Sequence, residues 1–201
     1  MYIQIEPNDI IVANYLASLR LNYEYRRSGY DYKQISESSL HINKFFDTKL
    51  ITTPSNIAIG ILAELLVFGD LTKYLANKGS NMIQEKFQYN LTIGAYDKGF
   101  DIIKQDKKID IKCYGTKVIC DINEISRFNL LVDKEQYEHT QSRADLYIQT
   151  FIVQRDKNIF LYIAGYATSS DLQLNTRFPK PAYCCSVNAL HSYEELKQRY
   201  F

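Results

Sequence analysis

One stretch of the chain predicts most of the fold: Gly99-Phe100-Asp101-Ile102-Ile103-Lys104-Gln105-Asp106-Lys107-Lys108-Ile109-Asp110-Ile111-Lys112-Cys113. It has the pattern of two short strands joined by a polar turn near Gln105 and Asp106. If the hairpin closes symmetrically around that turn, Asp101 lies directly opposite Asp110. Opposed residues have Cβ atoms only about 5 Å apart, and like charges placed there destabilise a sheet. The sequence therefore predicts a pair of carboxylates that needs a cation beside it.

The two faces of this hairpin differ in character. Lys112 lies two residues beyond Asp110, so it projects from the same face. The alternate positions are apolar and predict a face turned toward the core: Phe100, Ile102, Ile109, Ile111 and Cys113. One face is thus expected to be core, and the other to carry two acids and a lysine within reach of one another.

The composition is that of a single domain over residues 1–201 that buries a substantial core. The 24 basic and 23 acidic residues nearly cancel, which argues against a protein that coats DNA through bulk charge. Four cysteines without a Cys-x-x-Cys pair predict reduced thiols in a cytoplasmic protein and not a zinc site. Neither a signal peptide nor an apolar run of about 18 residues is evident, so no membrane association is expected.

The rest of the pattern predicts a mixture of helices and strands around the hairpin. Apolar periodicity predicts a helix over residues 8–28 and, after a polar stretch at 33–50, a largely buried helix from an N-cap at Thr53 to about Ala76. Strands are predicted over 82–93, 128–132, 144–153 and 159–163, a short polar turn or helix over 133–139, a capping box at Thr168, and a last helical segment over 192–197. This order predicts an α/β (α+β) domain around a mixed sheet of four to five strands flanked by helices.

Glu64 is the unusual residue of the second predicted helix. The positions three and four residues away are Gly60, Ile61, Val67 and Phe68, so the helix itself supplies no cation for it. Alone, Glu64 is more often a helix position that touches solvent. Together with the hairpin acids, it becomes a candidate third carboxylate of one site.

These groups suit one kind of chemistry. Carboxylates and a backbone carbonyl are the ligands that Mg²⁺ or Mn²⁺ prefers. Such an ion would relieve the repulsion between Asp101 and Asp110, activate a water and stabilise charge that grows on a phosphate. Lys112 would orient the water or neutralise the developing oxyanion. The alternative is a solvated sheet face with exposed charge pairs, which contribute only about 0–1 kcal/mol each.

The pattern resembles the PD-(D/E)XK nuclease superfamily, whose motif is an acid on one strand followed by Asp/Glu-x-Lys on the next. Asp101 and then Asp110-Ile111-Lys112 match it, with Phe100 in place of Pro, and Glu64 matches the Glu that many members carry on the preceding helix. The resemblance covers about residues 55–172, the expected catalytic core, and residues 1–50 would be a helical N-terminal elaboration. It implies a restriction-endonuclease-like fold and a metal-dependent nuclease that acts on DNA.

By resemblance, Asp101, Asp110 and the carbonyl of Ile111 would hold the metal, Glu64 would bind it directly or through water, and Lys112 would be the catalytic lysine. Arg26 and Arg27, interleaved with tyrosines, are the candidate nucleic-acid surface, and Gln149 is a further candidate beside the site. A homodimer would suit cleavage of both strands of a duplex. The alternative function is a catalytically silent nucleic-acid-binding or scaffolding module of the same fold.

Overall fold

A computed structural model describes residues 1–28, 53–90 and 99–201, with the backbone alone for 21–28, 53–56 and 115–117. The polar stretch at 33–50 lies outside the described residues. Arg26 and Arg27 lie on the described backbone of the first helix, but their side chains are outside the description.

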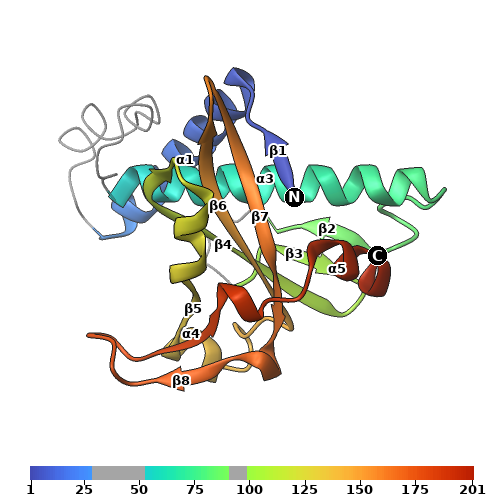
Figure 1. Cartoon of the computed structure of the whole chain (residues 1–201). Coiled ribbons are helices and arrows are strands. Elements are labelled where there is room, and N and C mark those ends of the chain that lie inside the picture. Colours follow the sequence, from blue (N-terminus) through green and yellow to red (C-terminus); the bar gives the residue numbers. More distant parts are fainter. Residues whose placement is uncertain (29–52, 91–98) are drawn as a thin grey trace.

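Two long helices cover one face of the sheet. Helix α1 (Pro7–Ser28) and helix α3 (Thr53–Asn77) begin and end within one or two residues of the predicted positions. Helix α3 buries most of its circumference, as its apolar pattern predicts. It ends at a left-handed residue, Gly79, where the amide of Ser80 donates to the carbonyl of Leu75. Figure 1 shows α3 running behind the strands.

The strands of the larger sheet are β1 (Tyr2–Gln4), β2 (Phe87–Tyr89), β3 (Ile102–Lys104), β4 (Lys107–Ile119), β6 (Leu146–Arg155) and β7 (Asn158–Thr168). Their order is β1-β7-β6-β4-β3-β2, with β4 and β6 parallel and every other pair antiparallel. This mixed α/β architecture confirms the predicted class. The sheet is wider than the four or five strands expected, because β1 joins its edge through only three residues, too few to give a sequence signal.

The hairpin register predicted from the sequence is confirmed for residues 102–104 and 107–109. It does not extend to the expected pairing of Asp101 with Asp110, because Asp101 precedes β3 and its amide donates to the carbonyl of Ile109. Ile102 pairs with Ile109, Ile103 with Lys108, and Lys104 with Lys107, around a turn at Gln105 and Asp106. Strand β2 is shorter than the predicted strand at 82–93. Residues 82–86 form turns that end at Lys86, which has a positive φ, and residues 91–93 lie outside the described residues.

A second sheet covers part of the other face of the larger one. It consists of β5 (Asn129–Asp133), β9 (Ala182–Ser186) and β8 (Gln173–Asn175), in that order, and was not predicted as a separate layer. Between β4 and β6 the chain forms the 3-10 helix η2 (Ile122–Arg127), then β5 and the short helix α4 (Lys134–Glu138). After β7, a capping box at Thr168 opens the 3-10 helix η3 (Ser169–Asp171), as expected, and helix α5 (Tyr193–Tyr200) follows an N-cap at Ser192.

The core is divided by the larger sheet. On the helix side, Ile102, Ile109 and Ile111 pack with α1, α3 and α5, as the hairpin pattern predicts. Phe100 does not join them; it packs with Leu130, Val132 and Tyr147 on the side of the small sheet. The prediction for Phe100 is wrong because strand β3 begins at Ile102 and the chain bends at Gly99 and Asp101, so the alternation does not extend back to Phe100.

The pairing of β6 with β7 is interrupted by a bulge. Gln149 pairs with Gly165, but the next residue, Thr150, pairs with Ile163, so Ala164 is an extra residue in β7. Before this bulge, Phe160, Tyr162 and Ala164 lie on the face away from the long helices, and after it Tyr166 packs on the helix side. Within the described residues, no helix is both long and apolar enough to cross a membrane.

Candidate active site

The sequence-predicted site residues come from three neighbouring elements. Glu64 lies in the middle of α3, Asp101 directly precedes β3, and Asp110 and Lys112 lie two residues apart on β4. Glu64 and Asp110 are buried, whereas Asp101 and Lys112 are partly exposed. The fold thus brings together residues that are up to 48 positions apart in the chain.

Asp101 is tied to both neighbouring strands by its backbone and its side chain. Its amide donates to the carbonyl of Ile109 at 2.9 Å, and its carbonyl accepts from the amide of Asn90 at 2.7 Å. Its Oδ2 accepts from the amide of Ile111 at 2.7 Å. The carboxylate is therefore fixed against the backbone of β4 at the residue between Asp110 and Lys112.

Burial and the neighbouring acids both act on the pKa of Asp101. Burial holds the pKa of the Asp101 carboxyl well above its usual value of 3.8, and the charges of Glu64 and Asp110 raise it further. The amide of Ile111 and the amine of Lys112 favour the ionised form, but they do not outweigh these effects. The ionised form of Asp101 is therefore disfavoured by its burial and by the negative charges of Glu64 and Asp110.

Lys112 is the cation that faces this charge. Its amine lies 2.8 Å from Oδ2 of Asp110, and the Asp110 side chain is only 5% exposed. The amine also donates to Oε1 of Gln136 at 3.1 Å. Because the carboxylate of Asp110 is buried, its contact with Lys112 is not an exposed surface pair. The interpretation of a solvated sheet face therefore does not describe Asp110.

Gln136 on α4 completes the arrangement, and sequence reasoning missed it. Its Nε2 donates to Oδ2 of Asp110 at 2.8 Å and to the carbonyl of Gly99 at 2.8 Å, while its Oε1 accepts from Lys112. A carboxamide is suited to this position because it supplies donors to an acid and a carbonyl and an acceptor to a lysine at once. Its position within a polar stretch, residues 133–139, indicated only a surface turn.

Tyr89 on β2 is the second residue that the sequence did not reveal. Its hydroxyl donates to Oε2 of Glu64 at 2.7 Å. Burial raises the pKa of Tyr89 far above its usual range, and the charge of Glu64 raises it further. Tyr89 therefore stays protonated and fixes the orientation of Glu64 from the neighbouring strand.

Gln149 lies beside the site but is buried, with 4% exposure. Its Nε2 donates to the carbonyl of Thr150 at 2.9 Å and to that of Lys112 at 3.3 Å, and Thr150 Oγ1 also donates to the Lys112 carbonyl at 3.1 Å. Gln149 thus supports the backbone that carries the lysine. Its predicted contact with nucleic acid stays a prediction that this geometry does not favour.

A hollow of about 340 Å³ opens next to these residues. Gly99, Glu135, Gln136, His139 and Ser142 line it. Gly99 has a φ of +77°, and a Cβ atom there would lie 2.4 Å from the carbonyl oxygen of Ser142. Glycine is therefore required where the hairpin passes the loop after α4, and Gln136, which donates to Asp110, lines the hollow.

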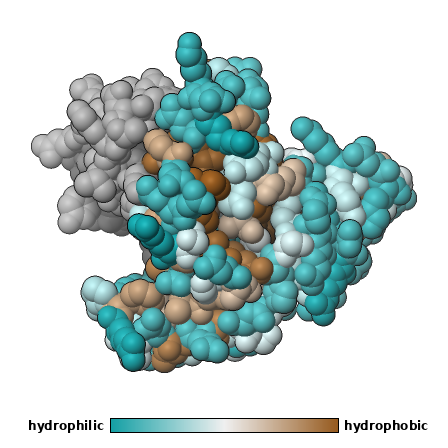
Figure 2. Space-filling model, in the orientation of Figure 1, coloured by the Kyte–Doolittle hydropathy of each residue, from teal (hydrophilic) through white to brown (hydrophobic). Residues whose placement is uncertain are grey.

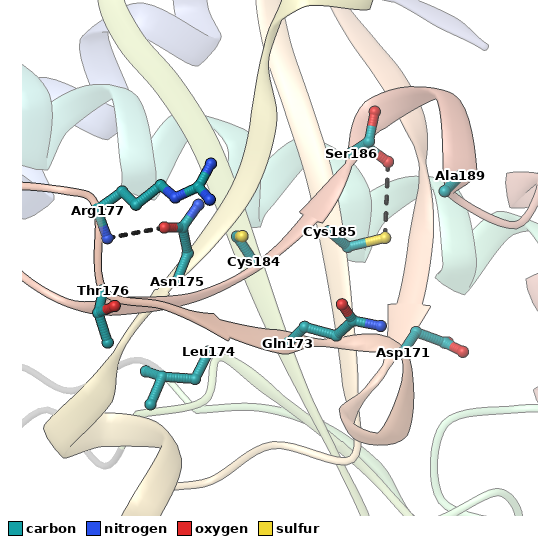
Figure 3. Close-up of a pocket in the computed structure, with 10 residues that line it drawn as sticks. All are labelled: Asp171, Gln173, Leu174, Asn175, Thr176, Arg177, Cys184, Cys185, Ser186 and Ala189. Atoms are coloured by element: carbon teal, nitrogen blue, oxygen red, sulfur yellow. Dashed lines mark hydrogen bonds between the residues drawn. The ribbon is translucent and has the colours of Figure 1, made fainter.

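A larger hollow of about 530 Å³ lies elsewhere, on the small sheet. Figure 3 shows Asn175 and Arg177 on one side of it and Cys184, Cys185 and Ser186 from β9 on another. None of the four candidate residues from the sequence lines it. None of the four cysteines of the chain forms a disulfide.

The residues at the hairpin fit a hard divalent cation by their chemistry. Within the described part of the chain, no three His, Cys, Asp or Glu side chains are grouped as a ready metal site. The carboxylates of Asp101 and Asp110 and the carbonyl of Ile111 are nevertheless oxygen donors, which Mg²⁺ and Mn²⁺ prefer. The pKa of Asp101 is raised first by burial and then by the negative charges of Glu64 and Asp110, and a bound cation would favour the ionised form again.

Comparisons with known proteins identify no relative. No family model matches the chain, and neither the curated proteins nor the solved structures contain a significant match. The geometry of the site is therefore the basis for any functional conclusion.

Proposed function

We propose that the chain is a metal-dependent nuclease that hydrolyses phosphodiester bonds in DNA, on a restriction-endonuclease-like core. The observation that carries the proposal is the contact of 2.8 Å between Lys112 and the buried Asp110. The amide of Ile111, the residue between them, donates a hydrogen bond to Asp101. An acid before one strand, an acid and a lysine on the next, and Glu64 on the preceding helix are the placement that the resemblance implies.

Asp101, Asp110 and the carbonyl of Ile111 would hold Mg²⁺ or Mn²⁺, and Glu64 would bind it directly or through water. When bound, the ion would lower the pKa of a water and stabilise charge on the phosphate. Lys112 supplies a mobile positive charge next to the acids, suited to orient the attacking water or neutralise a phosphate oxygen. Gln136 and Asp110 hold its amine in place, and Tyr89 holds Glu64.

The test is cleavage of supercoiled plasmid and of single-stranded and branched DNA, with Mg²⁺ or Mn²⁺. Wild type is compared with Lys112→Ala and with Lys107→Ala, a control on the same strand whose side chain is 55% exposed. Cleavage by wild type and Lys107→Ala, and not by Lys112→Ala, is the expected result. If Lys112→Ala still cleaves, or if wild type neither cleaves nor binds metal, the proposal fails and the silent binding module becomes the better description.

A further inference from the structure

A row of aromatic residues crosses the larger sheet at one register. Tyr114 on β4 pairs with Phe151 on β6, Phe151 pairs with Tyr162 on β7, and Tyr162 pairs with Tyr2 on β1. Tyr114 lies two residues beyond Lys112 on the same strand, so the row begins on the face that carries the candidate site. Neighbouring strands are about 4.8 Å apart, so the row extends about 14 Å from β4.

The inner part of the row is ordinary packing. Phe151 is fully buried, and the ring of Phe128 lies 4.3 Å from that of Tyr114 and 5.6 Å from that of Phe151. These residues form a small core with Ile119 and Ile125 of the β4–η2 region. They anchor the row by packing against one another.

The outer part of the row remains accessible. Tyr2 is 36% exposed, and Phe160 and Tyr162 are partly exposed beside it. The ring centroid of Tyr2 lies 4.8 Å from that of Tyr162 and 6.1 Å from that of Phe160. Figure 2, viewed from the side opposite the long helices, shows apolar side chains reaching the surface over the middle of β6 and β7.

One cation lies at the outer end of this surface, and another lies beyond the buried part of the row. The guanidinium of Arg155, an exposed residue, lies 4.8 Å from the ring centroid of Tyr2, and Lys112 is on β4, two residues before Tyr114. In the turn after Arg155, the exposed Asp156 and Lys157 cancel each other. Partly exposed rings with flanking cations are the combination that binds single-stranded nucleic acid, since bases stack on the rings and phosphates meet the cations.

We infer that Tyr2, Phe160, Tyr162 and Arg155 form a stacking surface for single-stranded DNA that leads to the site at Lys112. The inference rests on the proposed function and names its substrate class. Two or three stacked bases span the accessible rings, and the strand continues over the buried part of the row toward the acids. A duplex, whose bases are already stacked inside, gains nothing from these rings.

Binding is the direct test, measured by the anisotropy of fluorescein-labelled oligothymidylate with Ca²⁺ and, separately, with EDTA. The variants are Tyr162→Ala, Tyr162→Phe and Arg155→Ala. Tyr15→Ala is the control, because that tyrosine is 62% exposed on α1, which packs against the opposite face. Thermal unfolding of each variant shows whether it is folded.

Tyr162→Ala is expected to weaken binding by about five- to a hundredfold, whereas Tyr162→Phe and Tyr15→Ala leave it unchanged. Arg155→Ala, at an exposed position that the fold does not need, is expected to lower the salt dependence by about one phosphate contact. A duplex of equal length should bind more weakly and respond little to Tyr162→Ala. Unchanged binding in both Tyr162→Ala and Arg155→Ala overturns the inference, as does equal sensitivity of duplex and single strand.

The two proposals fail separately. If wild type cleaves DNA but substituting the aromatic rings leaves its affinity for oligothymidylate unchanged, the stacking surface is wrong and the nuclease proposal is retained. If the affinity depends on the rings but nothing is cleaved, the surface stands and the nuclease proposal is wrong.

Discussion

The amine of Lys112 and the Oδ2 atom of Asp110 lie 2.8 Å apart, on side chains from the same face of one strand. The contact joins a partly exposed cation to a carboxylate that is almost fully buried. Removing the lysine leaves that buried carboxylate with the amide of Gln136 as a hydrogen-bond donor, whereas removing the acid leaves the partly exposed lysine near solvent. The two truncations therefore differ in their effect on stability, although both are expected to abolish cleavage.

Lys112→Ala and Asp110→Ala are each predicted to reduce DNA cleavage by at least a hundredfold. Lys112→Ala should also lower the free energy of unfolding by about 1–3 kcal/mol, because a buried acid loses its cation. Single-turnover cleavage and urea unfolding of both variants provide the check. Cleavage retained by either folded variant would refute the assignment of the site.

The pH dependence of stability follows from Asp101. Its pKa in the folded protein lies well above the usual value of 3.8, so between these two pKa values the folded state binds more protons than the unfolded state. Stability without metal should therefore fall as pH rises from about 4 toward the folded-state pKa. Asp101→Asn keeps an acceptor for the Ile111 amide and removes the charge, so it should be more stable than wild type at pH 7 and similar to it near pH 4. Thermal unfolding in EDTA from pH 4 to 8 measures this, and parallel profiles for the two proteins would contradict it.

Divalent ions at pH 7 should make wild type more stable than Asp101→Asn, the reverse of the order expected without metal. An ion that binds the folded state at 100 times its Kd stabilises it by about 2.7 kcal/mol. Mn²⁺ or Ca²⁺ at pH 7 is predicted to raise the Tm of wild type, while Asp101→Asn should show little response. A chelator should return wild type to its starting Tm. An equal increase in both proteins would place any bound metal elsewhere.

Gln136 is predicted to act on activity through the positions of Lys112 and Asp110. Gln136→Ala removes a neutral amide from three partners and should lower kcat by about ten- to a hundredfold with little change in KM. Gln136→Glu should not rescue it, because a fourth carboxylate would face Asp110. Gln141→Ala is the matched control, since that side chain is exposed nearby. If Gln136→Glu cleaves as well as wild type, the positioning role is wrong.

Gly79 and Gly99 have nearly the same backbone conformation but different surroundings. Substituting each by alanine distinguishes the cost of backbone strain from the cost of a steric clash. Gly79 has a φ of +78° with nothing near a new Cβ, whereas Gly99 has a φ of +77° with the Ser142 carbonyl in the way. Gly79→Ala should cost about 1 kcal/mol of stability, from the left-handed conformation alone. Gly99→Ala should cost clearly more, and it should also impair cleavage because the Gly99 carbonyl binds Gln136. Equal Tm losses would show that the loop after α4 moves aside freely.

The sequence was sufficient where the signal is local. The hairpin register followed from the alternation between Ile102 and Cys113, and α3 followed from its Thr-Pro start, its apolar pattern and the glycine after its end. Asp110 and Lys112 were placed on one face for the same reason. Such features depend on side-chain periods of two residues in strands and 3.6 in helices, which can be recognised in a single sequence.

The remaining features depend on distant partners. Gln136 donates to Asp110, 26 positions earlier in the chain, and Tyr89 donates to Glu64, 25 positions earlier. Neither residue belongs to a sequence pattern that indicates a place in the site. The small sheet joins β5 to strands more than forty residues later. Phe100 was misplaced because a bend before β3 interrupts the alternation. Tertiary packing decided each of these.

The extra residue in β7 limits how this chain can change length. Because Ala164 adds one position, the strand presents aromatic residues to one layer before the bulge and Tyr166 to the opposite layer after it. Deleting Ala164 itself would only remove the bulge, because Ile163 would still pair with Thr150 and Gly165 with Gln149, so Tyr166 would keep its face. Deleting one residue from the regular part of the strand would instead exchange the two faces on one side of the deletion. We therefore expect natural changes of one residue in the length of this strand to occur at the bulge, and changes elsewhere in it to occur in pairs.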